Sequence, residues 1–283
     1  MSKESDIVKT IRNYYFESES AYRNWGKDEE REGVYALHGG FAIKGQELSH
    51  YEEVKELTRQ LIKFAQISPS SIVLDAGCGA GALVFELASE RPNTKIIGVN
   101  IAYNQLISAE NYRRKIPSDI VLFSNQDYHC LAFPNDTFDT VMFCESYIHS
   151  NDKRKLAQEV CRVLKPKGKI VISDTFLKRD PINKSEEIVL TDLKEGWYLP
   201  SILKIRELET IWREAGFNDI SFEEHTQNII ESSRRMRNHA ELKIAQGNYG
   251  SRVIKLSRKA TVACNEAFET GLTGYYFASG YKY

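Results

Sequence analysis

Two short segments of this 283-residue chain combine residue types at spacings that suit chemistry. The first is VLDAGCGAG at residues 73–81, where Asp75 is followed by glycine at every second position, Gly77, Gly79 and Gly81. Glycine adopts backbone angles that side chains forbid and lets the main chain approach a ligand closely. An apolar run that ends in an acid and then in such a loop is typical of a strand turning into a helix, where open α/β sheets bind nucleotides.

The glycine loop by itself leaves other interpretations open. Because Ala82 completes the looser G-x-G-x-x-A pattern, the same residues could form the fingerprint of a nicotinamide dehydrogenase. The loop could also be a tight turn without a ligand, in which Gly81 only allows the helix to pack closely. The rest of the chain has to decide between these interpretations.

The second segment is FCESYIH at residues 143–149, in which Glu145 and His149 follow an apolar run. A glutamate at the carboxyl end of a strand can act as a base or can stabilise a cation. His149 could instead be a surface residue, because it lies near the start of a predicted helix. Both residues are taken as candidate catalytic groups.

The elements that position these residues alternate between strand and helix from residue 71 to 175. Five short buried strands are predicted at 71–75, 94–99, 119–125, 138–144 and 169–174. After residue 200, an amphipathic helix with a glycine stop and two further strands, DISFEEH and GYYFASGYKY, are expected to close the sheet. The predicted fold is α/β, a doubly wound, seven-stranded, mostly parallel sheet.

The segments that flank this core differ from it in composition. Residues 1–60 are rich in Tyr and Trp and predict an N-terminal helical lid, residues 61–225 form the core, and residues 226–283 hold a helical insertion and the closing strand. Within the insertion, residues 231–259 carry eight Lys and Arg against two Glu, a surplus of six positive charges.

The composition of the whole chain restricts the kinds of molecule that the protein is expected to bind. The 38 Lys and Arg and the 39 Asp and Glu nearly cancel, which leaves no field to attract nucleic acid or an anionic membrane. No stretch approaches the about 18 apolar residues of a membrane span, and the N-terminus lacks the apolar core of a secretion signal. The five cysteines are scattered, so no disulfide or zinc site is expected. We expect a cytoplasmic protein with a small hydrophobic substrate, no nucleic-acid partner, no stable membrane insertion and no bound metal.

In combination, VLDAGCGAG, Asp127, FCESYIH, the KPKG turn and WREAGF resemble the class I S-adenosylmethionine-dependent methyltransferases over about residues 60–225. A dehydrogenase would account for the glycine loop but not for the KPKG turn or the closing strands. The resemblance implies a Rossmann-like methyltransferase fold and S-adenosyl-L-methionine as cofactor. It implies that the methionine part contacts the loop with Asp75, Gly77, Gly79 and Gly81, that the adenine lies near Asp127, and that Glu145 faces the methyl group.

The second strand ends in Asn100, where most of this superfamily has an acid that holds both ribose hydroxyls. With Gln105 five residues further on, Asn100 resembles the variant in enzymes that methylate an alkene carbon, the group of terpenoid, prenyl diphosphate, sterol and tocopherol C-methyltransferases. Two amides can bind a ribose diol without a net charge. Asn100 could also cap the following helix, and both roles can hold together.

In the alkene-methylating relatives, a Glu in an E-S motif equivalent to that of Glu145 looks like the base or the cation stabiliser. Attack of a π bond on the sulfonium methyl leaves a carbocation, which aromatic faces stabilise by about 0.5 to 2 kcal/mol each. Tyr22 lies in a Y-x-x-W-G run that resembles the lid of the terpenoid methyltransferases, and it joins Glu145 and His149 as a catalytic candidate. The candidate substrate-binding residues are Tyr14, Tyr22, Trp25, Tyr147, Trp197 and Tyr198. Packing of N-terminal helices on the sheet would also explain many of the lid aromatics.

The resemblance favours methyl transfer to an alkene carbon of an isoprenoid-type substrate, a prenyl diphosphate or a terpenoid metabolite. The alternative is N-, O- or aromatic C-methylation of another small metabolite, and a binding protein that keeps the cofactor site without catalysis is a third class. The basic insertion could bind a diphosphate, with Mg²⁺ bridging only through the substrate's phosphates, or could be a solvated helix face or a subunit contact. A homo-oligomer is compatible with the sequence.

Overall fold

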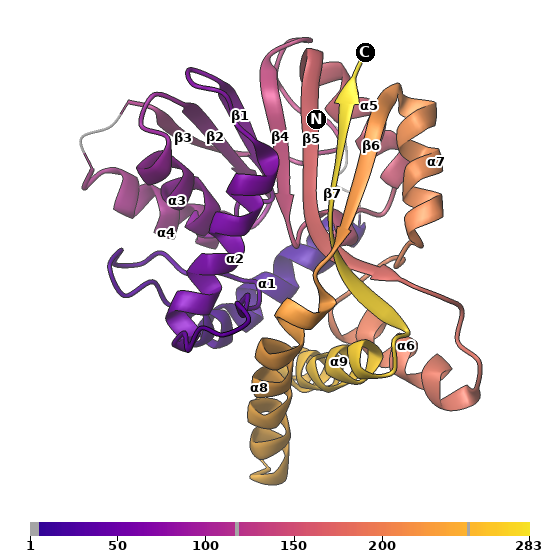
Figure 1. Ribbon diagram of the computed structural model, residues 1–283. Helices are drawn as coiled ribbons and strands as arrows, with labels where there is room; N and C mark the ends of the chain where they lie inside the picture. Colours follow the sequence, from indigo (N-terminus) through magenta and orange to yellow (C-terminus); the bar gives the residue numbers. More distant parts are fainter. Residues whose placement is uncertain (1–5, 117–118, 248–249) are drawn as a thin grey trace.

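The computed structural model describes residues 6–116, 119–247 and 250–283 (Figure 1). Residues 1–5 of the predicted lid and 248–249 of the predicted cap lie outside these ranges. Seven strands form a single sheet in the order β3-β2-β1-β4-β5-β7-β6. The strands are β1 (Ile72–Ala76), β2 (Lys95–Asn100), β3 (Val121–Asn125), β4 (Phe138–Cys144), β5 (Leu164–Leu177), β6 (Phe217–Glu224) and β7 (Thr273–Lys282). The first five strands pair in parallel, and β7 runs antiparallel between β5 and β6, which confirms the predicted fold.

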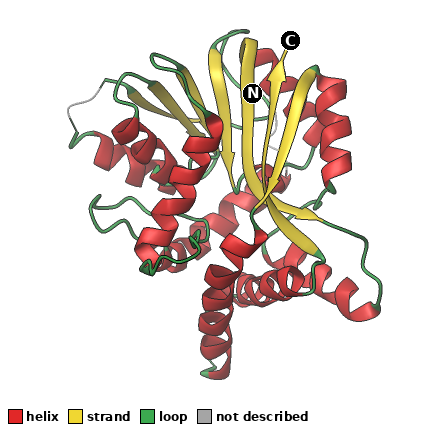
Figure 2. Cartoon of the chain, in the orientation of Figure 1, coloured by secondary structure: helices red, strands yellow, loops and turns green. Residues whose placement is uncertain are grey.

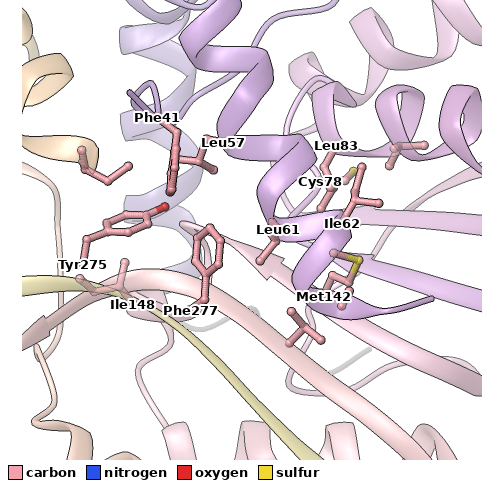
Figure 3. Close-up of a cluster of buried hydrophobic side chains, with 14 of the residues drawn as sticks. Phe41, Leu57, Leu61, Ile62, Cys78, Leu83, Met142, Ile148, Tyr275 and Phe277 are labelled. Atoms are coloured by element: carbon pink, nitrogen blue, oxygen red, sulfur yellow. The ribbon is translucent and has the colours of Figure 1, made fainter. Parts of the chain in front are cut away.

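Helices cover both faces of the sheet (Figure 2). One hydrophobic cluster joins the sheet to α2 (His50–Ala65), α3 (Ala82–Glu90) and α4 (Tyr103–Arg113). A second cluster joins it to α5 (Lys153–Val163) and α7 (Ile205–Ala215). In Figure 3, Leu57, Leu61 and Ile62 of α2 lie over the sheet residues Met142 and Phe277. The inner strands β1 and β4 are buried on both faces, which is why they read as continuous apolar runs, whereas the edge strands β3 and β6 are partly exposed.

The strand β5 is longer than the sequence pattern indicates. Its pairing with β4 shifts from Leu164 opposite Phe138 to Lys169 opposite Thr140, so the KPKG residues form a bulge inside the strand. Lys167 takes a left-handed φ of 66° there. The polar bulge hides the first residues of β5 from a search for apolar runs.

The segment predicted as a helical lid contains α1 (Asp6–Trp25) and the start of α2. Residue 60 lies inside α2, which packs on the sheet, so α1 and the connecting segment are the parts that overhang the sheet edge (Figure 1). We call residues 34–41 of that connection the strap. Its Gly40 N–H donates to Ser232 Oγ at 2.7 Å, and its Phe41 N–H donates to Glu53 O at 2.8 Å. These bonds fix the strap between α2, which holds Glu53, and the later helix α8 (Thr226–Ala245), which holds Ser232.

The cap at the other side of this edge contains α8 (Thr226–Ala245), α9 (Arg252–Glu269) and α6 (Lys184–Gly196). The sequence pattern did not indicate α6, which packs closely on α9. A Cβ at Gly196 would lie 2.6 Å from the Ala260 side chain, so this crossing needs a glycine. The carboxyl ends of β1, β4 and β5 point toward α1 and these cap helices (Figure 1). Within the described ranges, no helix is both long and apolar enough to cross a membrane.

Candidate active site at the carboxyl edge of the sheet

A cavity of about 700 Å³ lies between the carboxyl edge of the sheet, the strap, α1 and the cap. The strands contribute polar residues to its floor, among them Asp75, Asn100, Glu145 and Asp174. The helix α1 contributes mainly apolar and aromatic side chains to its walls, and α8 and α9 contribute both apolar and polar ones. A large, mainly apolar cavity with a few convergent polar groups is the usual form of a small-molecule site.

The glycine loop forms the floor of this cavity beneath the strap. Gly77, Gly79 and Gly81 have positive φ angles of 95°, 54° and 90°. A Cβ at Gly77 would lie 2.5 Å from Ser146 Cβ, and a Cβ at Gly79 would lie 2.6 Å from Leu37 Cδ1. The loop therefore accepts only glycine at both positions. Gly81 does not line the cavity; it precedes α3 and allows the close approach of Phe85.

Asp75 lines the cavity with its carboxylate but finds no partner within the described part of the chain. It is 2% exposed, and neither of its oxygens accepts a hydrogen bond. Burial raises the pKa of Asp75 to about 8. A buried carboxylate without donors costs free energy, so the position fits a ligand that brings a positive charge or N–H groups.

Asn100 and Gln105 lie together at the end of β2 and also line the cavity. Asn100 Nδ2 donates to Gln105 Oε1 at 2.7 Å, and Asn100 Oδ1 accepts from Ala102 N at 3.3 Å. Asn100 thus supports the start of α4, although Ala102 is the N-cap residue of that helix. Gln105 Nε2 is buried without a partner among the described residues, which leaves a neutral donor for a ligand.

Asp127 follows β3 and does not line the cavity in this structure. Its Oδ1 accepts from the His129 backbone N–H at 2.9 Å and contacts the His129 ring at 2.7 Å. Burial alone would raise the pKa of Asp127, but the bonds to His129 lower it. Its role beside an adenine stays a prediction.

Glu145 follows β4 with a left-handed φ of 49° and faces the cavity. Its Oε1 accepts two hydrogen bonds, from Tyr275 Oη at 3.0 Å and from the Gly39 N–H at 3.4 Å. Oε2 makes no hydrogen bond within the described ranges, so one oxygen is anchored and the other is available. Burial, and then the nearby Asp174 carboxylate, raise the pKa of Glu145 to about 8.

Two partners of Glu145 were missed in the sequence. Asp174 near the carboxyl end of β5 is 2% exposed and accepts from the Ile148 and Thr175 N–H groups, each at 2.9 Å. Burial raises the pKa of Asp174 to about 7. The position of Asp174 directly after the apolar KIVIS run was a sequence signal for its place at the sheet edge. No such signal marked Tyr275, because it comes from the antiparallel last strand.

His149 lies in a short 3-10 helix, Tyr147–His149, and its ring lines the cavity instead of the protein surface. Its Nε2 lies 3.0 Å from Tyr15 Oη of the lid helix α1, while its Nδ1 is buried without a partner in the described ranges. Burial lowers the pKa of His149 to about 4. The imidazole is therefore neutral at pH 7 and can accept a proton.

Three of the six aromatic candidates line the cavity: Tyr22, Trp25 and Trp197. Tyr14 does not; it is buried behind Tyr22, with the two hydroxyl oxygens 2.7 Å apart. Tyr198 packs on the ring of Tyr14 and is also outside the lining. The lining adds three aromatic residues that were not among the candidates, Tyr15, Tyr35 and Tyr128.

The assignment of Tyr147 to the substrate pocket is wrong. Its ring is fully buried in edge-to-face contact with Phe143 and Trp212, at centroid distances of 5.4 and 6.5 Å. It belongs to the hydrophobic cluster under α5 and α7. In the 3-10 helix the side chains of Tyr147 and His149 point in different directions, and their positions in the sequence alone do not show this.

The parallel sheet with its antiparallel β7, and the glycine loop at its carboxyl edge, define the class I S-adenosylmethionine-dependent methyltransferases. The family of the Methyltransferase domain matches residues 67–231, more than half of the sequence. The chain belongs to this family.

Comparisons with individual proteins extend this result. Phosphoethanolamine N-methyltransferase of Triticum aestivum is 28% identical over 182 residues, which cover 64% of this chain and 34% of that protein. The chain thus spans about a third of this relative's length. The structure of the [4+2]-cyclase SpnF has a TM-score of 0.79 at 20% identity, covering 97% of this chain and 96% of that one. A geranyl diphosphate C-methyltransferase from Streptomyces coelicolor A3(2) has a TM-score of 0.72 at 16% identity over 100% of both chains. At these identities the structural likeness shows the fold alone.

Proposed function

We propose that this chain transfers a methyl group from S-adenosylmethionine to an alkene carbon of an isoprenoid-type acceptor, a prenyl diphosphate or a terpenoid metabolite. The observation that carries the proposal is Glu145, whose carboxylate is held by one oxygen beside the glycine loop in a largely aromatic and apolar cavity. The fold shared with a geranyl diphosphate C-methyltransferase supports it.

The residues around the loop fit the cofactor. Gly77 and Gly79 line the cavity with backbone alone, and the unpartnered Asp75 carboxylate suits the positively charged methionine part. Asn100 and the free donor of Gln105 suit a neutral ribose diol. When bound, the cofactor supplies an electrophilic methyl group on a positively charged sulfur.

Glu145 completes the reaction on the acceptor. Methyl transfer would break the S–CH₃ bond, with its electrons staying on sulfur, and the π electrons of the alkene would form the new C–CH₃ bond. The neighbouring carbon would then carry the positive charge. The free oxygen of Glu145 accepts a proton from an adjacent carbon, and the electrons of that C–H bond form a new double bond. Tyr22, Trp25 and Trp197 exclude water from the cation and offer it their π faces.

A second candidate function is methylation of an amine, a hydroxyl or an aromatic ring of a small metabolite. The neutral His149 beside Tyr15 is a group that could take the proton from such an acceptor. The wheat relative that carries the name of an N-methyltransferase also favours it.

Glu145→Gln tests the role of the carboxylate. We expect the affinity for S-adenosylmethionine, measured by calorimetry, to stay within about twofold, because the amide keeps the shape of the side chain. Turnover should fall at least about tenfold, or about 1.4 kcal/mol of barrier. Glu187→Gln, an exposed glutamate on α6, is the matched control and should leave turnover unchanged. Equal turnover in the two variants would remove Glu145 from the mechanism.

The acceptor atom is decided by product analysis. The protein is incubated with methyl-labelled cofactor and a panel of geranyl, farnesyl and isopentenyl diphosphates, a neutral prenylated indole and an amine. Label in a carbon-methylated prenyl product is the expected result. Label that appears only on the amine would overturn the carbon-acceptor proposal in favour of the second candidate.

A further inference from the structure

The ionisable residues that line the cavity are separated by sign. The carboxylates of the lining are Asp75, Glu145 and Asp174, and all three come from the sheet edge. The Lys and Arg side chains of the lining are Lys243 on α8 and Arg258 on α9, at the cap. Within the described residues, the acidic and basic groups therefore occupy different walls of a single cavity.

The two cations belong to the cavity wall rather than to a solvated face. The lining residues of α8 are Met236, His239, Ala240 and Lys243, a spacing that places them on one face of the helix. Those of α9 include Ile254, Ser257, Arg258 and Thr261, again on a single face. Lys243 and Arg258 thus lie on the faces of α8 and α9 that are turned to the cavity.

Other basic residues of the insertion are already engaged by carboxylates. Arg234 pairs with Glu231 and Glu269, Arg235 pairs with Glu53, and Arg237 pairs with Glu241. Lys243, in contrast, makes no ion pair within the described ranges. Among the Lys and Arg residues of the described insertion, Lys243 and Arg258 are the two whose side chains line the cavity.

Between the two charged walls the lining is mainly aromatic and apolar, with Tyr22, Trp25 and Trp197 among its residues. A ligand that satisfies the whole cavity has an apolar body and one anionic end. The anionic end is attracted by the cations of the cap, whereas the acidic groups at the sheet edge offer it no positive charge. This arrangement would place the opposite end of the ligand beside Glu145.

We propose that Lys243 and Arg258 form a subsite for an anionic group, a phosphate ester or a carboxylate, at the end of the acceptor remote from the reacting carbon. The proposal rests on the proposed function for the identity of the acceptor. The Arg guanidinium can bind two anion oxygens at once, and Lys243 adds a point charge. The subsite would fix which way the acceptor lies in the cavity and so which carbon meets the methyl group.

Binding measurements with matched ligands test the subsite. Trp25 and Trp197 line the cavity, so quenching of tryptophan fluorescence reports occupancy. The probes share one hydrocarbon chain: geranyl diphosphate, geranic acid and the neutral geraniol. The variants are Lys243→Ala with Arg258→Ala, the charge-conserving Lys243→Arg, and Lys259→Ala as control, because Lys259 is an exposed cation on α9 outside the lining.

In the double variant we expect binding of the anionic probe that the wild type prefers to weaken at least tenfold, with no more than a twofold change for geraniol. The wild-type affinity for that probe should also fall as salt is raised. Lys243→Arg and Lys259→Ala should bind like the wild type. The preferred probe then tells a phosphate ester from a carboxylate.

Three results would overturn the subsite: no anionic probe binds more tightly than geraniol, the double variant keeps the affinity of the wild type, or it weakens all three probes equally. Melting temperatures of the variants identify a folding defect. Methylation of geraniol without any preference for anions would remove the subsite and leave the proposed function standing. Anion binding that depends on Lys243 and Arg258, without methylation of any prenyl probe, would keep the subsite and remove the proposed function.

Discussion

Glu145 shows how a carboxylate in the cavity is held by residues far away in the chain. Its Oε1 receives the Tyr275 hydroxyl from the last strand and the Gly39 N–H from the strap, while Asp174 lies close enough to raise its pKa. Hydrogen bonds to the ionised form lower a carboxyl pKa, and burial or a like charge raises it. The balance of these effects gives a pKa of about 8, near the pH at which a general base works best.

Tyr275→Phe separates the positioning of Glu145 from its proton transfer. The lost hydrogen bond no longer stabilises the ionised carboxylate, so the pKa of Glu145 rises further. If ionised Glu145 is the base, the acidic limb of the profile of kcat against pH moves to higher pH, and kcat at pH 7 falls several-fold. The measurement is the pH profile at saturating acceptor.

Tyr276→Phe is the control for this variant, because the neighbouring Tyr276 hydroxyl contacts Glu224 away from Glu145. Its profile should match that of the wild type. A uniform loss of rate in Tyr275→Phe, without a displaced limb, would show that Tyr275 acts only through packing.

At the scale of elements, α2 and the strap carry the link between the sheet and the lid. The helix begins with a capping box in which Ser49 Oγ accepts from the Glu52 N–H at 3.3 Å and Glu52 Oε2 accepts from the Ser49 N–H at 2.7 Å. Its buried face packs on the sheet with Leu57, Leu61 and Ile62 (Figure 3). The strap precedes α2, whose start is fixed by this capping box, and its Gly39 N–H reaches Glu145.

Ser49→Ala should lower the free energy of unfolding by about 1 kcal/mol, because the Glu52 N–H at the start of α2 loses its side-chain acceptor and the capping box is broken. Turnover of the folded protein should stay within about twofold, since Ser49 does not line the cavity. Urea denaturation measures the loss. Ser185→Ala, an exposed serine in the first turn of α6, is the control. A loss no larger than that of the control would mean that the capping box does not contribute.

At the scale of the whole molecule, the fold places the carboxyl groups of Asp75, Glu145 and Asp174 at one edge of the sheet. Burial raises the pKa of Asp75 and Glu145 to about 8 and that of Asp174 to about 7. The unfolded chain releases these protons near pH 4, whereas the folded protein keeps them up to pH 7 or 8. Their stabilisation is present at low pH and is lost as the pH rises through these folded values.

The stability of the ligand-free protein should therefore fall from pH 6.5 to pH 8. Below pH 6.5, His38 and His149, whose pKa burial lowers to about 4, oppose the trend, because the unfolded chain binds their protons more tightly. Each kcal/mol lost lowers Tm by about 2–4 °C in a protein of this size. Calorimetric scans at several pH values measure the slope.

Asp75→Asn should reduce this slope by about a third, because one of the three titrating carboxyls is gone. It should also weaken the binding of S-adenosylmethionine, since the contact proposed between the Asp75 carboxylate and the cofactor is removed. A Tm that stays flat or rises from pH 6.5 to 8 in the wild type would contradict the raised pKa values.

Much of the sheet and its loop could be predicted because both depend on residues close together in the chain. The alternation of apolar runs with amphipathic helices indicates the parallel core, and the glycines of the loop carry the positive φ angles that the pattern requires. Glu145 follows a strand and so had to lie at the carboxyl edge. The helix α6 and the bulge in β5 escaped because neither has an apolar pattern that marks its limits.

The sequence by itself therefore determined the class of the protein, the floor of its cavity and the carboxylate at that floor, because short-range periodicity and backbone freedom decide them. Only the tertiary structure decided that Tyr275 reaches Glu145 and that Tyr147 is buried while Tyr15 lines the cavity. It also decided that Lys243 and Arg258 line the same cavity from the cap. The reason is that these contacts depend on the register of β7 against β5 and on the crossing of α8, α9 and α1. Register and crossing are set by long-range packing, which leaves no signature in neighbouring residues.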